Sequence, residues 1–404
     1  METLSLSALF AFVLSSAGFT QSTLSDLPKI GTRLNGAELR LGGFSGLWCD
    51  PSETGSRIRH CRTHTDRGPN LSTDNGDFQK QASSEERPFA VPGFQPRWVD
   101  LEIDTQTAKA SVVGMIGLHA SHGPTQIPLT GIPNLRDADE APVDERGRAL
   151  AYDPDGIDPE SIARASDGSF WMGEEYGPSL LHFSADGELL TRYVPEGSGR
   201  IGRHVDTQAL LPNHYALRVK NRGFEAIAIQ NARIYAFLQS GLEPAEDSGL
   251  CRILVWNPET LTTEAEYLYQ LGKGADKISD AIAMPTPGHF RLIEQNGKTG
   301  DKAVRRIVEV DLSTATNLVE SSGGYPELPE TMSDSQRSRA GIYAATGRKV
   351  FDLAASGWAD ASKAEGLAAL DANASSMIVV NDNDFGVGDQ PQAVSRIGIV
   401  RTGL

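Results

Sequence analysis

The chain has 404 residues, and its 53 Asp and Glu against 37 Lys and Arg give a formal net charge of −16. Nucleic-acid binding depends on clustered cations, so this balance excludes a nucleic-acid partner. Hydrophobic residues make up 39% of the chain, and its 41 Gly and 22 Pro are spread along the sequence. This composition excludes a disordered chain, a collagen and a coiled coil, and it supplies enough apolar residues for a sizeable core.

The first residues follow the pattern of a secretory signal peptide. Residues 4–14 form an apolar run too short to span a membrane, and small residues at 15–18 follow it. We predict a signal peptide over residues 1–21, a mature domain over residues 22–404 without a membrane span, and a secreted or periplasmic location. The segment before the apolar run holds Glu2 and no Lys or Arg, so a buried N-terminal helix remains the alternative.

The chain contains three cysteines. Cys49 and Cys61 fall on two predicted strands joined by a turn at 51–56, which allows either a disulfide or two buried thiols. Cys251 lies in an apolar run and is predicted to be a small core residue. No Cys or His spacing indicates a zinc site.

A short phrase recurs five times along the chain. Each copy holds small and apolar residues after one polar residue, which suits a strand packed tightly near an axis. Recurrence at intervals of tens of residues indicates a solenoid or a propeller. The copies are Phe44-Ser45-Gly46-Leu47-Trp48, Pro159-Glu160-Ser161-Ile162-Ala163, Phe224-Glu225-Ala226-Ile227-Ala228, Ser279-Asp280-Ala281-Ile282-Ala283 and Ala364-Glu365-Gly366-Leu367-Ala368.

β-rich runs separated by turn signals follow the copies, and this predicts a four-stranded meander in each unit. The last unit ends one strand short, and residues 30–41 have no unit of their own. We therefore predict an all-β fold, a single β-propeller with five visible units that is closed by pairing of its N- and C-terminal strands. A sixth, degenerate blade within 120–152 or 201–220 and an irregular β-sandwich remain the alternatives.

Polar residues collect at one predicted rim, because the first strand of each blade begins beside the end of the second. The register repeats, since Glu174, Gln239 and Glu294 each follow a first-strand acid by 14 positions. Carboxylates gathered at one opening repel one another unless a cation joins them, and donors that are all oxygen favour Ca²⁺ in an exported protein. The predicted metal ligands are Glu160, Glu225, Asp280, Glu365, Glu294, Asp66, Asn381 and Asp382.

Two further roles are assigned at this rim. Glu174 and Glu175 are predicted to be catalytic and to orient a water molecule. Arg67, Arg222 and Lys363 are predicted to bind an anionic substrate beside the metal. The alternatives are that the first-strand acids cap backbone amides of the next blade, and that the three cations form ordinary ion pairs.

The combination of motifs resembles the phytase-like family, also described as esterase-like activity of phytase. The resemblance covers nearly the whole mature chain and implies an exported β-propeller that hydrolyses phosphate or other esters. The motifs that carry it are Phe44-Ser45-Gly46-Leu47, Asp66-Arg67-Gly68, Glu160 with Glu174-Glu175-Tyr176-Gly177-Pro178, Asn221-Arg222-Gly223-Phe224-Glu225, Glu365-Gly366-Leu367 and Asn381-Asp382-Asn383-Asp384-Phe385-Gly386.

The sequence thus predicts a monomeric, Ca²⁺-dependent hydrolase of small phosphate esters or other esters that works at the channel mouth. Two alternatives remain open at this point. One is a propeller that binds a ligand or partner without catalysis, with structural acids at its rim. The other is a Ca²⁺-dependent lactonase, which would act on sugar lactones and not on phosphate esters.

Overall fold

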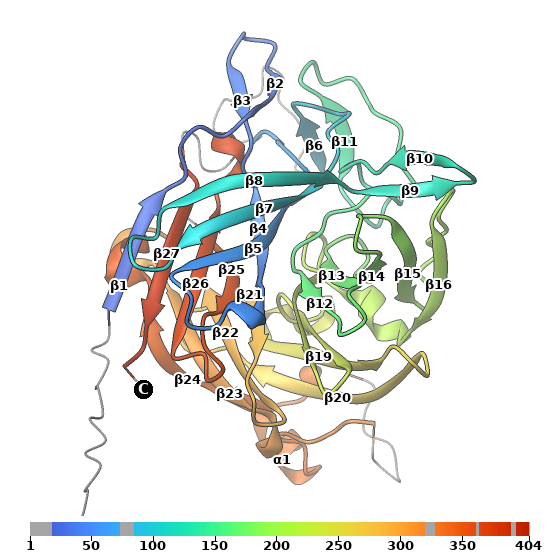
Figure 1. The fold of residues 1–404 in the computed structure, drawn as a ribbon. Helices are drawn as coiled ribbons and strands as arrows, with labels where there is room; N and C mark the ends of the chain where they lie inside the picture. Colours follow the sequence, from blue (N-terminus) through green and yellow to red (C-terminus); the bar gives the residue numbers. More distant parts are fainter. Residues whose placement is uncertain (1–17, 73–84, 320–327, 361–362, 389–392, 404) are drawn as a thin grey trace, which may run out of the picture.

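The computed structural model describes residues 18–72, 85–319, 328–360, 363–388 and 393–403 (Figure 1). These residues form 27 strands and one short α-helix, α1 (Asp334–Arg339), together with several turns of 3-10 helix and one of π-helix. No helix in these ranges has the length and apolar character that crossing a bilayer requires. The predicted all-β class is confirmed.

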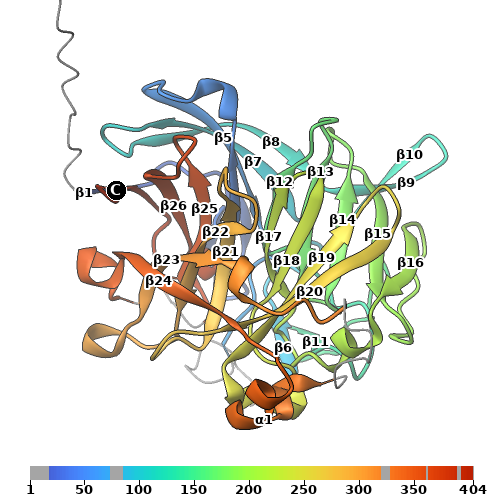
Figure 2. The same cartoon turned by 90° about the horizontal axis from the view of Figure 1, so that it is seen from below.

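Most strands belong to five four-stranded groups, which can be followed in Figure 2. The first two groups are antiparallel meanders, and the parallel strand β16 (Asp206–Leu211) extends the second. Their strands are β4 (Phe44–Cys49), β5 (Ile58–Thr65), β7 (Arg97–Asp104) and β8 (Ala110–Gly117), then β12 (Ala163–Arg164), β13 (Phe170–Glu174), β14 (Ser179–Phe183) and β15 (Leu189–Pro195).

The third and fourth groups form one eight-stranded sheet, because their outer strands pair in parallel through Tyr269 and Ala345. The fifth group combines the last three strands with the first strand of the described chain. In order, the strands are β17 (Phe224–Gln230), β18 (Arg233–Leu238), β19 (Leu250–Asn257), β20 (Thr262–Gln270), β21 (Lys277–Ala283), β22 (His289–Gln295), β23 (Arg305–Asp311), β24 (Ala345–Asp352), β25 (Lys363–Ala369), β26 (Ser376–Asp382), β27 (Arg396–Arg401) and β1 (Gly18–Thr23).

Strand β1 supplies the strand that the last unit lacked. It pairs antiparallel with β27 over its whole length, from Gly18 opposite Arg401 to Thr23 opposite Arg396. The sequence suggested residues 30–41 for this role, but that segment forms a separate hairpin of β2 (Lys29–Thr32) and β3 (Glu38–Arg40). The predicted boundary after residue 21 falls within β1.

The first strands of the five groups are neighbours in a cyclic order, since β4 contacts β12 and β25, β12 contacts β17, and β21 contacts both β17 and β25. Little space separates them. A Cβ added to Gly46 would lie 2.7 Å from the Cα of Ser161, and one added to Gly366 would lie 3.0 Å from the carbonyl carbon of Gly46. The close packing of the first strands therefore explains the recurring small residues, as the sequence indicated.

A β-bulge occurs at the recurring acid in three of these first strands. The pairing register skips Glu225 in β17, Asp280 in β21 and Glu365 in β25. A bulge adds an unpaired residue and re-aims its side chain. The repeated bulge is the local reason that these acids turn away from the regular alternation of the strands.

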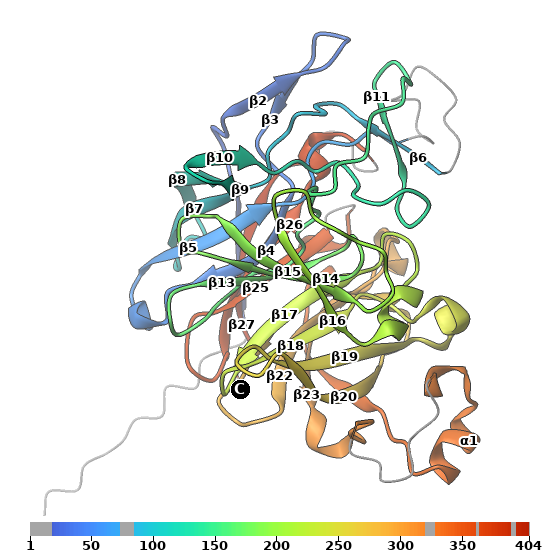
Figure 3. The same ribbon diagram turned by 90° about the vertical axis from the view of Figure 1, so that its right-hand side faces the viewer.

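Segments outside the five groups cover one side of the molecule. The β2–β3 hairpin and the parallel pair of β6 (Glu86–Phe89) with β11 (Ala141–Asp144) lie on the same side in Figures 1 and 3. Residues 120–152 also contribute to the β9 (His119–His122) and β10 (Thr125–Pro128) hairpin. Neither 120–152 nor 201–220 forms a four-stranded group of its own.

The structure decides between the disulfide and the two buried thiols that the sequence allowed for Cys49 and Cys61. Cys49 and Cys61 stand directly opposite each other on β4 and β5 and form a disulfide. Cys251 is a free thiol with no exposed surface in β19. Both the disulfide alternative and the core role of Cys251 are confirmed.

Removal of β1 tests how much the pairing of the terminal strands contributes to stability. Phe19 packs against Trp358, and Trp358 Nε1 donates a 2.6 Å hydrogen bond to Gln21 Oε1. We expect deletion of residues 1–23 to lower the free energy of unfolding by at least about 3 kcal/mol, because it exposes this packing and the edge of β27. Deletion of residues 1–17 is the control and leaves the chemical-denaturation midpoint unchanged; equal midpoints for both deletions would contradict the prediction.

Candidate functional site

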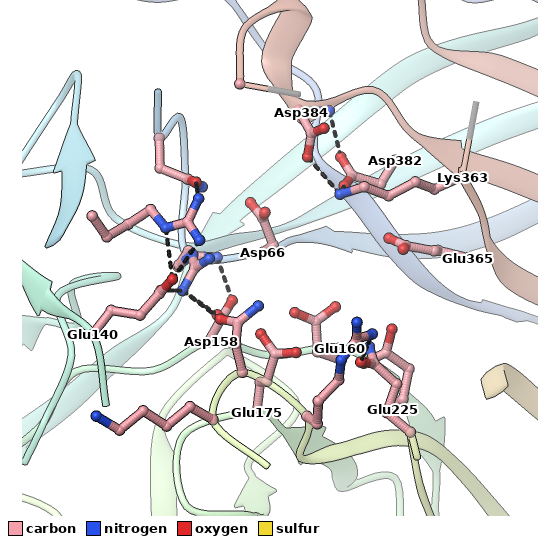
Figure 4. A pocket seen from close by; sticks show the side chains of 18 of the residues that line it. Asp66, Glu140, Asp158, Glu160, Glu175, Glu225, Lys363, Glu365, Asp382 and Asp384 are labelled. Atoms are coloured by element: carbon pink, nitrogen blue, oxygen red, sulfur yellow. Dashed lines mark hydrogen bonds and ion pairs between the residues drawn. The ribbon is translucent and has the colours of Figure 1, made fainter. Parts of the chain in front are cut away.

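A cavity of about 500 Å³ opens where first strands begin and second strands end (Figure 4). Its walls are charged almost throughout, with carboxylates and cations drawn from all the groups of strands and from the β6–β11 side. The acidic lining residues are Asp66, Glu85, Glu140, Asp158, Glu160, Glu175, Glu225, Glu365, Asp382 and Asp384, and the basic ones are Arg67, Arg87, Lys220, Arg222, Lys277 and Lys363.

Three carboxylates form the tightest cluster in the cavity. One oxygen from each of Asp158, Glu160 and Glu175 lies within 4.8 Å of the others, and all three side chains are buried. The backbone sets this arrangement, because Glu175 N donates to Asp158 O at 3.0 Å and Glu160 N donates to Gly173 O at 3.0 Å. The segment before β12 is thereby held against the end of β13, and side chains two residues apart point to the same side.

The electrostatics of this cluster favour a cation. Burial and the charge of Glu175 raise the pKa of Asp158 to about 8 against the pull of Arg67. Burial, together with Glu225 and Asp158, raises the pKa of Glu160 well above its usual range. Glu225 Oε2 is buried and has no hydrogen-bond partner. Donors of this kind, all carboxylate oxygens, fit a hard divalent cation such as Ca²⁺.

The opposite wall of the cavity carries its own compensating charge. Lys363 Nζ bridges Asp382 at 2.7 Å and Asp384 at 2.6 Å (Figure 4). Burial works against the charged form of Lys363, but the two aspartates outweigh it and raise the pKa of this ammonium group. Burial also works against the charged form of Asp382, and Lys363 outweighs it and lowers the pKa of that carboxyl.

Two arginines neutralise the carboxylate on the β6–β11 side. Glu140 accepts hydrogen bonds from Arg67 Nη1 at 2.8 Å and from Arg87 Nε at 2.8 Å. Burial favours its neutral form, yet the two guanidinium groups lower the pKa of Glu140 to about 2. Arg67 also lies 3.3 Å from Asp158, so it links this wall to the acidic cluster. Arg222 Nη1 donates to the uncharged Gln239 at 2.5 Å.

The structure brings together most of the residues that the sequence selected. They come from segments up to about three hundred residues apart and face one cavity (Figure 4). The predicted residues that line it are Asp66, Glu160, Glu175, Glu225, Glu365 and Asp382 among the acids, and Arg67, Arg222 and Lys363 among the cations.

Three predicted metal ligands do not line the cavity. Asp280 accepts hydrogen bonds from the backbone amides of Ala281 at 2.8 Å and Leu367 at 2.7 Å. It is therefore the cap onto the next group that the sequence allowed as an alternative. Glu294 turns instead to Tyr269 Oη at 2.5 Å and Arg306 Nε at 2.7 Å.

Asn381 and Glu174 also make their contacts outside the cavity. Asn381 Oδ1 accepts from the backbone amide of Arg396 at 2.5 Å and so links the ends of β26 and β27. Glu174 is fully buried 3.9 Å from Arg192 Nε and does not line the cavity, although it is adjacent in sequence to Glu175. Successive residues of a strand point to opposite sides, which explains why only one of the two acids reaches the cavity.

Some lining residues were missed by the sequence predictions. Asp158 could have been predicted from the sequence, because it lies two positions before Glu160 in an extended segment, and residues two apart in such a segment share one face. Glu140 and Arg87 could not, since they reach the cavity from the β6–β11 pair, whose parallel pairing joins segments about fifty residues apart.

Comparisons with solved structures give distant likenesses. A family-43 β-1,3-galactosidase is 8% identical with a TM-score of 0.43, over 95% of this chain and 60% of that one. A thermostable family-43 glycoside hydrolase is 7% identical with a TM-score of 0.40, over 92% and 91% of the two chains. A gluconolactonase from Xanthomonas campestris is 9% identical with a TM-score of 0.36, over 96% and 99%.

Similarity in sequence adds a relative and a family. A protein of Arthroderma benhamiae named "Uncharacterized secreted protein" is 29% identical over 102 residues, which cover 21% of this chain and 20% of that protein. The profile of the Phytase-like family, described as esterase-like activity of phytase, matches residues 87–385, a range that holds most of the lining residues. The chain therefore belongs to the Phytase-like family.

Proposed function

We propose that this protein is an exported, metal-dependent hydrolase of phosphate esters or other esters. The observation that carries the proposal is the buried cluster of Asp158, Glu160 and Glu175 in one cavity with several cations. Membership of the Phytase-like family supports the hydrolase class. A cavity of about 500 Å³ is in the range of small-molecule sites, which are roughly 300–1,000 Å³.

The architecture that we propose is a five-bladed β-propeller closed within its last blade. The five four-stranded groups, the cyclic order of their first strands and the pairing of β1 with β27 support this description. In such a ring the first strands line the central channel, and a site at their starting ends receives one side chain from each blade. The lining of the cavity follows this pattern.

The cluster of three carboxylates is where we place the cation. Asp158, Glu160 and Glu175 would hold it, with Glu225 on the neighbouring first strand β17 and Glu365 on β25, two positions away in the cyclic order. A bound divalent cation such as Ca²⁺ would polarise a phosphoryl or carbonyl oxygen of the substrate. Asp66 and Asp382 line the same cavity and complete the acidic surround.

The side chains around the cluster supply the remaining roles. Arg222 Nη1 donates to the side-chain amide oxygen of Gln239, a neutral acceptor that leaves the guanidinium charge available to an anionic substrate. Lys363 is already bridged by two aspartates and Arg67 by Glu140, so these two cations act mainly by holding the cavity walls in place. Of the two predicted catalytic acids, Glu175 is the one that can orient a water molecule toward bound substrate.

Export rests on three observations. The N-terminal segment has the pattern of a signal peptide, Cys49 and Cys61 are joined, and the similar protein from Arthroderma benhamiae is named as secreted. Disulfides persist in oxidising compartments, which suits a secreted or periplasmic protein. Since β1 begins at Gly18, a mature chain that starts at this residue would retain the whole strand.

The metal site can be tested with single carboxylate changes. We expect Glu160→Gln and Glu175→Gln each to weaken Ca²⁺ binding at least about tenfold in calorimetry, because each removes one charged ligand from the cluster. The matched control is Glu196→Gln, which changes an exposed acid after β15. Unchanged Ca²⁺ affinity in both cluster variants would contradict the metal site.

The dependence of stability on pH gives a second test. The pKa of Asp158 is raised from its usual 3.8 to about 8, so its contribution to stability is complete at low pH and is lost as pH rises toward 8. A cation stabilises the charged carboxylates and reverses this loss. The rise in Tm on adding Ca²⁺ should therefore be several degrees larger at about pH 8 than at about pH 6, measured by differential scanning fluorimetry. An equal rise at both values would contradict it.

Activity can be tested on a panel of phosphate monoesters, carboxylic esters and sugar lactones. We expect Ca²⁺-dependent release of phosphate or alcohol, and a 10- to 100-fold loss of kcat/KM in Arg222→Met, roughly the value of one charge-assisted hydrogen bond. Arg146→Met, an exposed arginine after β11, is the control. Hydrolysis of lactones alone would indicate a lactonase, and no hydrolysis with intact Ca²⁺ binding would indicate a binding protein.

A further inference from the structure

The structure contains a second, smaller cavity. It shares no lining residue with the acidic cavity. Its volume is about 70 Å³, too small for an organic substrate and large enough for one small ion. It lies where the loop before β11, the β13–β14 turn, the β15–β16 loop and the segment after β16 meet. Its lining residues are Ala138, Gly177, Ser198, Arg200, Ala216 and Arg218.

The buried charges around this cavity do not balance. Arg192, Arg200 and Arg218 are cations, and Asp139 and Glu174 are the carboxylates among them, and all five side chains are at most 8% exposed. Arg200 interacts electrostatically with each of the other four. Three positive and two negative charges leave a net charge of +1, and a buried charge that lacks a counter-ion is costly.

The ion pairs and hydrogen bonds around the cavity use only some of the N–H donors of Arg200 and Arg218. Asp139 accepts from Arg200 at 3.2 Å and also pairs with Arg218. Arg200 Nη1 donates to Asn134 Oδ1 at 2.6 Å, and Arg218 Nη1 donates to Val219 O at 3.0 Å. These contacts occupy the ends of both guanidinium groups and fix the two planes.

Three donor atoms of the lining residues remain without partners. Arg200 Nε, Arg218 Nε and Ser198 Oγ are buried and make no hydrogen bond. Arg200 packs directly against Gly177, because a Cβ at this position would lie 2.7 Å from Arg200 Nε, and the φ of +131° at Gly177 is one that other residues rarely adopt. The residues that line the cavity therefore carry unpartnered N–H and O–H donors, and the buried charges around it sum to a net positive charge.

We propose that this cavity binds one monovalent anion of the halide class, such as chloride, between Arg200 and Arg218. The ion would accept hydrogen bonds from the two Nε–H groups and from Ser198 Oγ, and it would bring the buried charge to zero. The site is independent of the acidic cavity in its residues and of the proposed hydrolase activity. It adjoins Glu174 and Asp139, the immediate neighbours of Glu175 and Glu140, so an ion here would stabilise one wall of that cavity.

Bromide is the direct probe of this site. Crystals of the mature protein soaked in sodium bromide should show an anomalous-scattering peak within about 3.5 Å of both Nε atoms. In solution, Tm should be roughly 2–4 °C higher in sodium chloride than in sodium gluconate at equal ionic strength, because gluconate is too large to enter. The gain should saturate as chloride replaces gluconate.

Variants separate the site from general salt effects. Arg218→Met should abolish the chloride gain, and Ser198→Ala, which keeps every charge, should raise the chloride concentration for half the gain several-fold. Arg203→Met, an exposed arginine in the same loop, is the matched control and should retain the full gain. If Arg218→Met does not fold, Ser198→Ala decides.

Several results would overturn the proposal. These are equal Tm in the two salts, the absence of an anomalous peak between the arginines, and a chloride gain that Ser198→Ala leaves unchanged. A peak without any effect on Tm also counts against it, as an adventitious ion only. Loss of Ca²⁺ binding or of ester hydrolysis in other tests would leave this proposal standing, since it uses different residues.

Discussion

At the centre of the molecule, the first strands of the five groups lie so close together that only small residues fit between them. Gly46 and Gly366 have no room for a Cβ, and Ser161 lies against Gly46. This packing leaves the larger polar residue of each repeat no space within the regular strand. The bulges at Glu225 and Glu365 turn these acids out of the regular alternation of their strands, and both acids line the acidic cavity.

The concentration of acids at that opening creates the central electrostatic problem of the fold. The protein solves it with internal cations on two walls, where Lys363 bridges two aspartates and two arginines hold Glu140. In the tightest cluster, burial and the neighbouring carboxylates raise the pKa values of Asp158 and Glu160, even though Arg67 lies 3.3 Å from Asp158. This carboxylate cluster between the two neutralised walls is the reason that we propose it as the place for a cation.

Much of the fold could be predicted because its repeat is local. The five phrases, the turns that follow them and the need for a closing strand are visible in the sequence, and so is the opposition of Cys49 and Cys61. The sequence did not show which segment pairs with β27. β1 is a six-residue segment that overlaps the end of the predicted signal peptide, and its partner lies almost four hundred residues away. The segment at 30–41 has a clearer strand pattern in the sequence, but it forms the β2–β3 hairpin and does not pair with β27.

The site was predicted in outline from the common register of the repeats. The register correctly placed Glu160, Glu225 and Glu365 at one opening, since equivalent positions of equivalent strands occupy equivalent places. Asp280 and Glu294 have the same spacing but do not line the cavity, because Asp280 accepts from backbone amides and Glu294 accepts from Arg306. Equivalent backbone positions do not guarantee equivalent partners, because each partner comes from a neighbouring group with its own side chains.

The sequence by itself determined the β class, the number of repeated units, the family and the kinds of charge that meet at one rim, because each depends on residues close together in the chain. Only the tertiary structure decided which acids cluster together and which are neutralised. That division depends on Asp158, Lys363 and Arg67 meeting partners from other groups at distances of about 3 Å. The same reason applies to the arginines around Asp139, whose excess positive charge appears only when four separate loops are packed together.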